Sequence, residues 1–328
     1  MRRLITFQIF VPLNSLLHNI SDVAQAYQEG IAELSEMDHI LFALPNVGET
    51  ACKISHVKQY ISKVDKYAIK CEALVFTIKL PIQKSERIFY DKKGQRNTKT
   101  INNFIINTAE EFEIQVTNFF LFLQIAKPLA FKTRKGDLFI NKVLFQHFDE
   151  IISIHQESFE DIQVLKWPVY KSLKFKKVLD WSQKYQLSFD NIAQTKLGIA
   201  LNAYSYLFEY NTSYTLDLLW SLIGIESLYC SSKDGIADQI FERSQLVLGP
   251  ITDFKKRLKS MYNFRSRFIH GDLMISSSIA QSFITEEVEN FSEEFYQASI
   301  LAIAILTASL QKMVEMDKSE LSFKTVLV

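Results

Sequence analysis

Glycine and proline are scarce in this chain. Its 328 residues include only 9 Gly and 6 Pro, whereas hydrophobic residues make up 48% and charged residues 23%. This composition excludes low-complexity and disordered classes, and it is typical of a folded protein with enough apolar material for a core. At this length two domains are expected rather than one.

An excess of either charge is also missing. The chain has 37 Lys and Arg against 37 Asp and Glu, so its formal net charge is zero. Proteins that bind long nucleic-acid duplexes through the phosphates usually carry a basic excess. Any nucleic-acid contact must therefore rest on a local basic patch, which favours a compact RNA over bulk DNA as substrate.

Cysteine is rare, and the common nucleotide and zinc motifs are absent from the sequence. The 3 Cys, at Cys52, Cys71 and Cys230, are odd in number, and no pair has metal-ligand spacing. This pattern favours neither a disulfide framework nor a zinc site, and it fits a cytoplasmic protein. The chain has no GxGxxG, P-loop or HExxH sequence, which excludes the folds and zinc hydrolases that carry them. We expect no metal ion and no cofactor.

Two apolar segments raise the question of a membrane. Residues Leu4–Leu13 follow two arginines, as in a signal peptide, but Gln8 and Pro12 interrupt them and no small-residue cleavage site follows. We therefore expect a first β-strand there. Residues Ala298–Leu310 are shorter than a membrane span and include two serines and a threonine, so we expect a buried helix. No membrane segment is predicted.

The first half of the chain mixes strand and helix patterns. Residues Tyr67–Ile82 carry β-branched and aromatic residues in rough alternation, which predicts a strand, and the polar Lys84–Lys99 predicts a loop. Residues Thr108–Lys127 begin with a cap-like Thr-Ala-Glu-Glu sequence and predict an apolar helix. Residues Arg134–Asp137 predict a hairpin turn. We therefore interpret residues 1–165 as an α+β domain for sensing or substrate recognition.

From about Tyr170 onward the chain is almost purely helical. We interpret residues 166–318 as an all-α helical bundle and residues 319–328 as a C-terminal tail. Residues Thr215–Tyr229 are apolar on every face and are expected to form the most buried helix of the bundle. The other helices are expected over Asp190–Glu209, Asp234–Leu248, Thr252–His270 and Ser282–Met316.

One segment, Tyr262–Gly271, concentrates residues that suit phosphodiester chemistry. His270 is the only histidine of the C-terminal half, and it stands where a helix is expected to end, at the negative end of the helix dipole. Six basic residues and no acidic one occur over Lys255–Arg267. An imidazole can carry protons, and the guanidinium of Arg265 can hold the charge that builds on phosphoryl oxygens.

The spacing of these two residues raises a geometric difficulty. Five residues of a straight helix turn through roughly 500°, which leaves Arg265 and His270 about 140° apart on different faces. Arg267, three residues before His270, would share its face. Either the helix loosens near its end, or the Arg265 side chain curls round it, or a second copy of the chain completes the site.

The same segment resembles the motif of the HEPN superfamily (higher eukaryotes and prokaryotes nucleotide-binding domains), which has Arg, a polar residue, several variable positions and His. Arg265, Ser266 and His270 match these positions, and Tyr262 and Gly271 make the resemblance closest to the Apea-like HEPN group. The resemblance covers roughly residues 190–316. Two further pieces resemble that group in the same order along the chain, Leu218–Tyr229 with its Glu226, and Ile240–Gly249.

This resemblance implies a metal-independent endoribonuclease that works as a homodimer, with two motifs facing each other. It implies that the ribose 2′-hydroxyl attacks the adjacent phosphate and leaves 2′,3′-cyclic phosphate and 5′-hydroxyl ends. His270 would be the general acid or base, Arg265 would stabilise the pentacoordinate phosphate, and Ser266 would orient one of them. The implied substrate is tRNA or another structured RNA, and the implied role is antiviral defence, abortive infection or that of a toxin.

The residues around this motif allow a structural as well as a functional interpretation. Glu226 either fixes Arg265 or simply bridges two helices, in which case Arg243 is its expected partner. Tyr262 is taken as a supporting residue. We expect Lys255, Lys256, Lys259 and Arg267 to form a solvated basic face, and together these residues could guide RNA.

Three functions follow from these interpretations. The first is an endoribonuclease of the kind just described. The second is a non-catalytic RNA-binding or regulatory HEPN module, in which the Arg and His only grip phosphate. The third is a structural helical bundle that dimerises. The N-terminal domain is expected to take a phage-derived or other activating ligand, and no membrane partner is expected.

Overall fold

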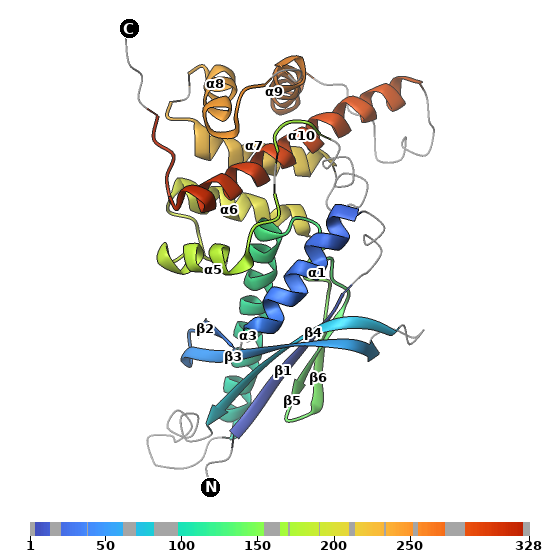
Figure 1. Ribbon diagram of the computed structural model, residues 1–328, viewed down its shortest axis with the longest axis vertical. Coiled ribbons are helices and arrows are strands. Elements are labelled where there is room, and N and C mark those ends of the chain that lie inside the picture. The colour runs from blue at the N-terminus through green and yellow to red at the C-terminus, as the bar shows by residue number, and fades with distance from the viewer. Residues whose placement is uncertain are drawn as a thin grey trace. The chain divides into compact units, whose positions relative to one another are not determined.

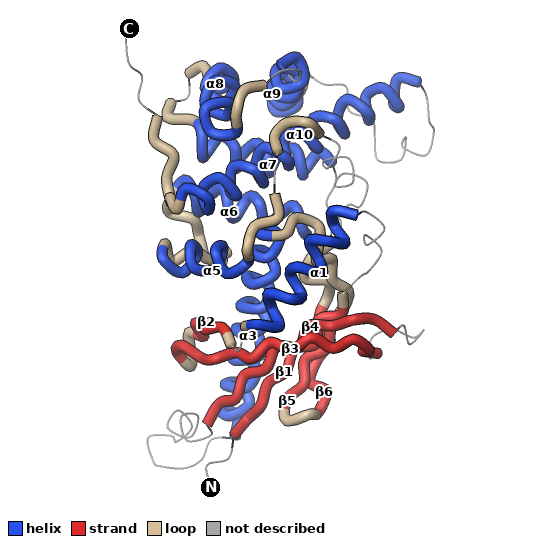
Figure 2. Tube along the Cα trace, viewed as in Figure 1, coloured by secondary structure: helices blue, strands red, loops and turns tan. Residues whose placement is uncertain are grey.

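The computed structural model describes residues 4–13, 21–37, 39–61, 70–81, 98–153, 165–169, 171–189, 191–209, 214–232, 234–251, 255–272 and 286–323. The chain divides into two compact units, Met1–Ser153 with Lys174–Lys176, and Ile154–Leu173 with Lys177–Val328. An antiparallel sheet followed by helices confirms the expected order of an α+β part and a helical part (Figures 1 and 2). The predicted boundary at residue 165 lies within the second unit.

The first unit is built on a six-stranded antiparallel sheet with the order β2-β3-β4-β1-β5-β6. The predicted strands over residues 4–13 and 67–82 are confirmed as β1 and β4. Alternation along β1 places Phe7, Ile9 and Val11 on a fully buried face and leaves Thr6 and Gln8 half-buried on the other. The strands are β1 (Leu4–Pro12), β2 (Ile40–Leu44), β3 (Gly48–Ile61), β4 (Lys70–Pro81), β5 (Gly136–Ile140) and β6 (Val143–Phe148).

Two helices, α1 (Ser21–Glu36) and α3 (Thr98–Ala126), cover one face of this sheet. The ring of Phe76 in β4 lies 5.0 Å from that of Phe119 and 5.8 Å from that of Phe120, both in α3. Tyr27 of α1 donates a hydrogen bond to Glu72, which projects from the same face of β4. The opposite face, with Gln8 and its neighbours, carries no helix among the described residues of this unit.

The helix α3 begins ten residues earlier than the sequence predicts. Thr108 was expected to cap the helix, yet it is fully buried inside α3, which starts at Thr98. The prediction was wrong because the buried Phe104 continues the apolar side of the helix that Thr108 and Phe112 also occupy. The predicted loop over residues 84–99 lies outside the described residues, apart from the first two residues of α3.

The predicted hairpin turn at Arg134–Asp137 is also wrong. Gly136 and Asp137 belong to β5, and the turn follows at Asn141 and Lys142, whose φ angles are 50° and 68°. Two consecutive positive φ angles define a type I′ turn, whose twist matches that of the flanking strands. The carboxylate of Asp137 is buried, where Tyr60 and His147 donate hydrogen bonds to it.

The second unit is a helical bundle organised around its last helix. In Figure 1, α10 (Glu286–Met316) runs past the other helices of the bundle, and it contacts α6, α7, α8 and α9. Residues Ala298–Leu310 of α10 are buried throughout, as predicted. The other helical segments are α5 (Phe175–Lys184, whose first two residues fall in the first unit), α6 (Lys196–Ser205), the 3₁₀ segment η2 (Tyr206–Phe208), α7 (Tyr214–Tyr229), α8 (Ile236–Leu248) and α9 (Lys255–His270).

Two expectations for this bundle need correction. Among the residues whose burial is described, the longest buried stretch of the bundle is Ala298–Leu310 of α10 and not α7, because α7 keeps Leu216 exposed and several other residues half-exposed. The helix expected over Asp190–Glu209 is shorter, since α6 starts after Thr195, whose hydroxyl accepts a hydrogen bond from the Gly198 N–H at 3.0 Å. Thr195 is therefore the N-cap residue, and α6 begins with the residue that follows it.

One helix of the described chain is long and apolar enough to cross a membrane. This is Glu293–Met316 of α10, and 83% of its apolar stretch is buried inside the structure. The core helix of a bundle passes the same test of length and composition. Of the residues expected to form a C-terminal tail, those described up to Phe323 pack against the bundle: Leu321 is buried, and the ring of Phe323 lies 6.0 Å from that of Tyr229.

Candidate functional site

The helix α9 ends in a backbone motif that leaves His270 exposed. Gly271 has a φ angle of 75°, which a residue without Cβ adopts at little cost. The Gly271 N–H donates to the Phe268 carbonyl at 3.3 Å, and the Asp272 N–H donates to the Arg267 carbonyl at 2.8 Å. These two bonds form a Schellman motif, which fixes the end of the helix. His270 is the last helical residue and is exposed.

A guanidinium–carboxylate pair joins α9 to α7. The Nη2 atom of Arg265 donates to Oε2 of Glu226 at 3.1 Å and lies 3.0 Å from Oε1. Only 23% of the Arg265 side chain and 20% of the Glu226 side chain are exposed. The guanidinium carbon lies 5.7 Å from the centre of the Tyr262 ring, one turn earlier in α9. Glu226 therefore pairs with Arg265, and the same contact bridges α7 and α9, so it fits both interpretations of this carboxylate.

Burial dominates the electrostatics of this pair. It raises the pKa of the Glu226 carboxyl, and the charge of Arg265 offsets only part of the rise. Burial also raises the pKa of the Tyr262 phenol, and the Glu226 charge adds to that rise. The ionised Glu226 carboxylate therefore lowers the stability of the folded state. What it provides is a fixed position for the Arg265 guanidinium. The Nε atom of Arg265 is buried and has no hydrogen-bond acceptor among the described residues.

Within one chain the structure does not bring Arg265 and His270 together. The side chain of Arg265 is engaged with α7, whereas His270 is exposed at the end of a helix that stays regular up to that residue. The helix does not loosen and the arginine does not curl round it, so two of the three solutions expected for their spacing are wrong. The buried side of α9 is formed by Leu258, Met261 and Phe264.

The remaining predicted site residues spread along α9. Ser266 is half-buried next to Arg265, and Lys259 and Arg267 are exposed. Of Lys255 and Lys256 only the helical backbone is described. The exposed cations make this a basic helix whose charge is open to solvent, as the sequence predicts.

Arg243 is not the partner of Glu226, contrary to the alternative drawn from the sequence. Its guanidinium donates to the Tyr229 carbonyl at the end of α7 and to the Ser231 hydroxyl at 3.1 Å. It also lies 5.0 Å from the centre of the Phe323 ring. Arg243 therefore ties α8 to the end of α7 and to the C-terminal segment, which is a structural role.

A polar hollow in the first unit was not predicted from the sequence. The open face of the sheet in the first unit contains a polar hollow lined by residues of β1, β3, β4 and the β5–β6 turn. The polar residues Thr6 and Gln8 alternate with buried ones along β1, which was a signal for an exposed face. No group of three or more His, Cys, Asp or Glu residues that could hold a metal ion occurs in the described part of the chain.

Comparisons of the chain with protein-family models, with curated proteins and with solved structures give no match. The resemblance of Arg265, Ser266 and His270 to the HEPN motif therefore stays a prediction.

Proposed function

We propose that this protein is a metal-independent endoribonuclease of the HEPN type, with tRNA or another structured RNA as its substrate. The observation that supports this most is that one basic helix carries both an anchored guanidinium, Arg265, and an exposed imidazole, His270. RNA cleavage by the neighbouring hydroxyl needs a group that moves a proton and a fixed cation that offsets phosphoryl charge. The helix α9 supplies both, and its exposed cations attract phosphate.

In the proposed reaction the imidazole of His270 accepts the proton of the ribose 2′-hydroxyl. The 2′ oxygen forms a bond to phosphorus, and the bond from phosphorus to the 5′ oxygen breaks. The leaving 5′ oxygen takes a proton from an imidazolium, so the products are a 2′,3′-cyclic phosphate and a 5′-hydroxyl. Arg265 offsets the charge on the pentacoordinate phosphate through the N–H groups that Glu226 does not engage, and Ser266 orients it.

The proposed site requires two copies of the chain. Because Arg265 and His270 lie on different faces of α9, one phosphate can reach both only if they come from two helices. A homodimer with two facing α9 helices meets this need. The proposal includes a cytoplasmic role in antiviral defence, in abortive infection or as a toxin.

One observation favours a second function, a non-catalytic RNA-binding or regulatory module. Arg265 already has a carboxylate counter-charge in Glu226. A guanidinium whose charge is offset stabilises a developing negative charge less than a free one. In this alternative, Arg267 and Lys259 hold phosphate and His270 adds a third contact.

The test is to incubate the full chain with total tRNA in EDTA and to determine the product ends. The proposal predicts cyclic phosphate and 5′-hydroxyl ends, and it predicts that His270→Ala and Arg265→Gln each abolish cleavage. Lys318→Gln removes one exposed charge from the same unit and should cleave like the wild type. RNA binding without product would favour the second function. A strict requirement for a divalent metal would contradict the proposal.

A further inference from the structure

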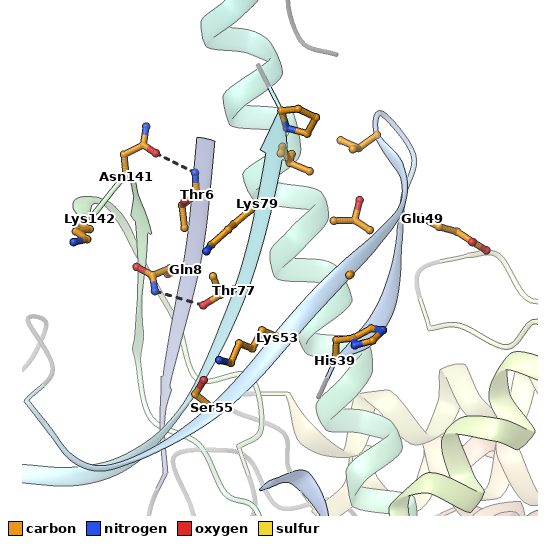
Figure 3. A pocket seen from close by; sticks show the side chains of 15 residues that line it. Thr6, Gln8, His39, Glu49, Lys53, Ser55, Thr77, Lys79, Asn141 and Lys142 are labelled. Carbon is orange, nitrogen blue, oxygen red and sulfur yellow. Dashed lines mark hydrogen bonds between the residues drawn. The ribbon is translucent and has the colours of Figure 1, made fainter. Parts of the chain in front are cut away.

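The face of the sheet opposite α1 and α3 is hollowed at one end (Figure 3). The hollow has a volume of about 1030 Å³, which is close to the upper end of the roughly 300–1,000 Å³ that small-molecule sites usually measure. Its floor consists of polar side chains of neighbouring strands, Thr6 and Gln8 of β1, Ser55 of β3 and Thr77 of β4. The amide of Gln8 donates to the Thr77 hydroxyl at 3.4 Å, a long bond that a ligand could replace.

Three lysines give this hollow a positive charge. Figure 3 shows the side chains of Lys53 and Lys79 lying over the floor, with Lys142 at the rim. The one carboxylate among the lining residues, Glu49, points away from the floor. No described residue forms an ion pair with any of these lysines, whereas Lys127, for instance, pairs with two glutamates. Lysines that line one hollow, with no ion-pair partner among the described residues and with a floor of polar side chains beneath them, suit an anionic ligand.

Aromatic rings lie beside the hollow on the same face of the sheet. Phe139 of β5 stands directly opposite Gln8, and Phe10 follows two residues later in β1. Both are half-buried, and their ring centres lie 5.2 Å apart in an edge-to-face arrangement, while one face of the Phe10 ring is stacked on Tyr60. Rings next to cations provide both contacts that nucleotides use, stacking for the base and charge for the phosphate.

We propose that this open face binds a phosphorylated nucleotide, either free or as part of a single RNA strand. Its phosphates contact Lys53, Lys79 and Lys142, and a base packs against Phe10 and Phe139. The site belongs to the first unit alone. It therefore does not depend on ribonuclease chemistry at α9, and each of the two proposals can fail without the other.

The test measures binding of a labelled, 5′-phosphorylated 2′-O-methyl hexa-adenylate to the full chain by fluorescence anisotropy at several salt concentrations. This probe lacks the 2′-hydroxyl and cannot be cleaved. The double variant K53Q/K79Q should bind roughly tenfold or more weakly, with a salt slope lower by about 1.4, because each single-strand phosphate contact contributes about 0.7. The matched control K58Q/K70Q removes two exposed lysines from the same two strands and should bind like the wild type.

Competition with ATP separates the two sources of the ligand. If ATP displaces the probe and K53Q/K79Q weakens ATP as well, the site takes free nucleotides. If only the oligonucleotide binds, it takes an RNA strand, and either result supports the proposal. The proposal is overturned if neither probe binds, or if both double variants lose affinity equally. It is also overturned if R257Q/K259Q in α9 abolishes binding while K53Q/K79Q does not.

Discussion

Removing Arg265 should destabilise the helical unit, and a second substitution at Glu226 should restore it. The change Arg265→Gln leaves the Glu226 carboxylate in a site where only 20% of its side chain is exposed, without its counter-charge. The change Glu226→Gln removes that uncompensated charge while keeping the shape of the side chain. The double variant E226Q/R265Q therefore has a neutral pair that can form hydrogen bonds.

The burial of the pair sets the size of the effect. Exposed ion pairs contribute roughly 0–1 kcal/mol, and breaking a fully buried pair costs roughly 3–5 kcal/mol. Arg265 and Glu226 lie between these limits, so Arg265→Gln should lower the free energy of unfolding by about 1–3 kcal/mol at neutral pH. The double variant should lie within about 1 kcal/mol of the wild type, so the substitution at Glu226 recovers most of the stability that Arg265→Gln loses.

The pH dependence follows from the raised pKa of Glu226. A carboxyl with a raised pKa in the folded state binds its proton more tightly when folded. Its contribution to stability is fully present below its ordinary pKa and is lost as the pH rises through the folded-state pKa. Arg265 lowers that pKa, so its removal moves the pKa further up. The deficit of Arg265→Gln should thus be small in acid and largest at neutral pH.

Tryptophan fluorescence provides the assay. All 3 Trp, at 167, 181 and 220, lie in the second unit, so urea unfolding followed by fluorescence reports on the unit that contains the pair. The four proteins of the double-mutant cycle are compared at pH 7 and at pH 4.5. If Arg265→Gln unfolds at the same urea concentration as the wild type at pH 7, the pair has no energetic consequence and the reasoning is refuted.

Three further predictions concern other parts of the chain. Gly224→Ala should cost about 1–3 kcal/mol in the same fluorescence assay, since a Cβ there would lie 2.8 Å from Leu306 and push α7 from α10. Asp137→Asn should lower the free energy of unfolding by roughly 1–3 kcal/mol, because it alters a fully buried side chain that accepts two hydrogen bonds. Unchanged amide exchange in β5 would refute this. Burial raises the pKa of the Cys230 thiol to about 11, so it should react at pH 8 far more slowly than free cysteine.

Periodicity along the chain was enough to predict much of the fold. The strands β1 and β4 show alternation, α7 is a long apolar stretch, and α8, α9 and α10 have helical patterns with stop residues; each was found close to its expected place. The errors arose where local signals compete with tertiary contacts. Lys135-Gly136-Asp137 has the chemistry of a turn, yet Asp137 pairs with Phe10 in the sheet and is buried with Tyr60 and His147.

The candidate site was predictable in its parts but not in its arrangement. A carboxylate inside the apolar α7 had to find a partner, and Arg265 was one of two expected. Arg243, the other expected partner, instead donates hydrogen bonds to the carbonyl of Tyr229 and the hydroxyl of Ser231 at the end of α7, and the sequence did not reveal these contacts. The hollow over β1, β3 and β4 depends on strand register, which sets Thr77 beside both Gln8 and Lys53. Sequence alone does not reveal that register.

The separation of Arg265 and His270 on α9 leads to a last prediction, that two inactive variants complement each other. If the active site combines Arg265 of one chain with His270 of the other, a heterodimer of H270A and R265Q chains keeps one complete site. Purified through two different tags, this heterodimer should have about half the wild-type activity toward tRNA. E226Q/R265Q can replace R265Q so that lost stability is not mistaken for lost chemistry.

A matched control shows whether the recovery comes from a shared site. A heterodimer of H270A with H270A/R265Q has the same tags and interface but no wild-type His270 in either chain, so it should stay inactive. An H270A–R265Q heterodimer as inactive as its parents would mean that no site combines Arg265 of one chain with His270 of the other. Since α9 holds these two groups on separate faces of one helix, that result would leave no single phosphate within reach of both, and phosphate binding without cleavage would become the better account of this helix.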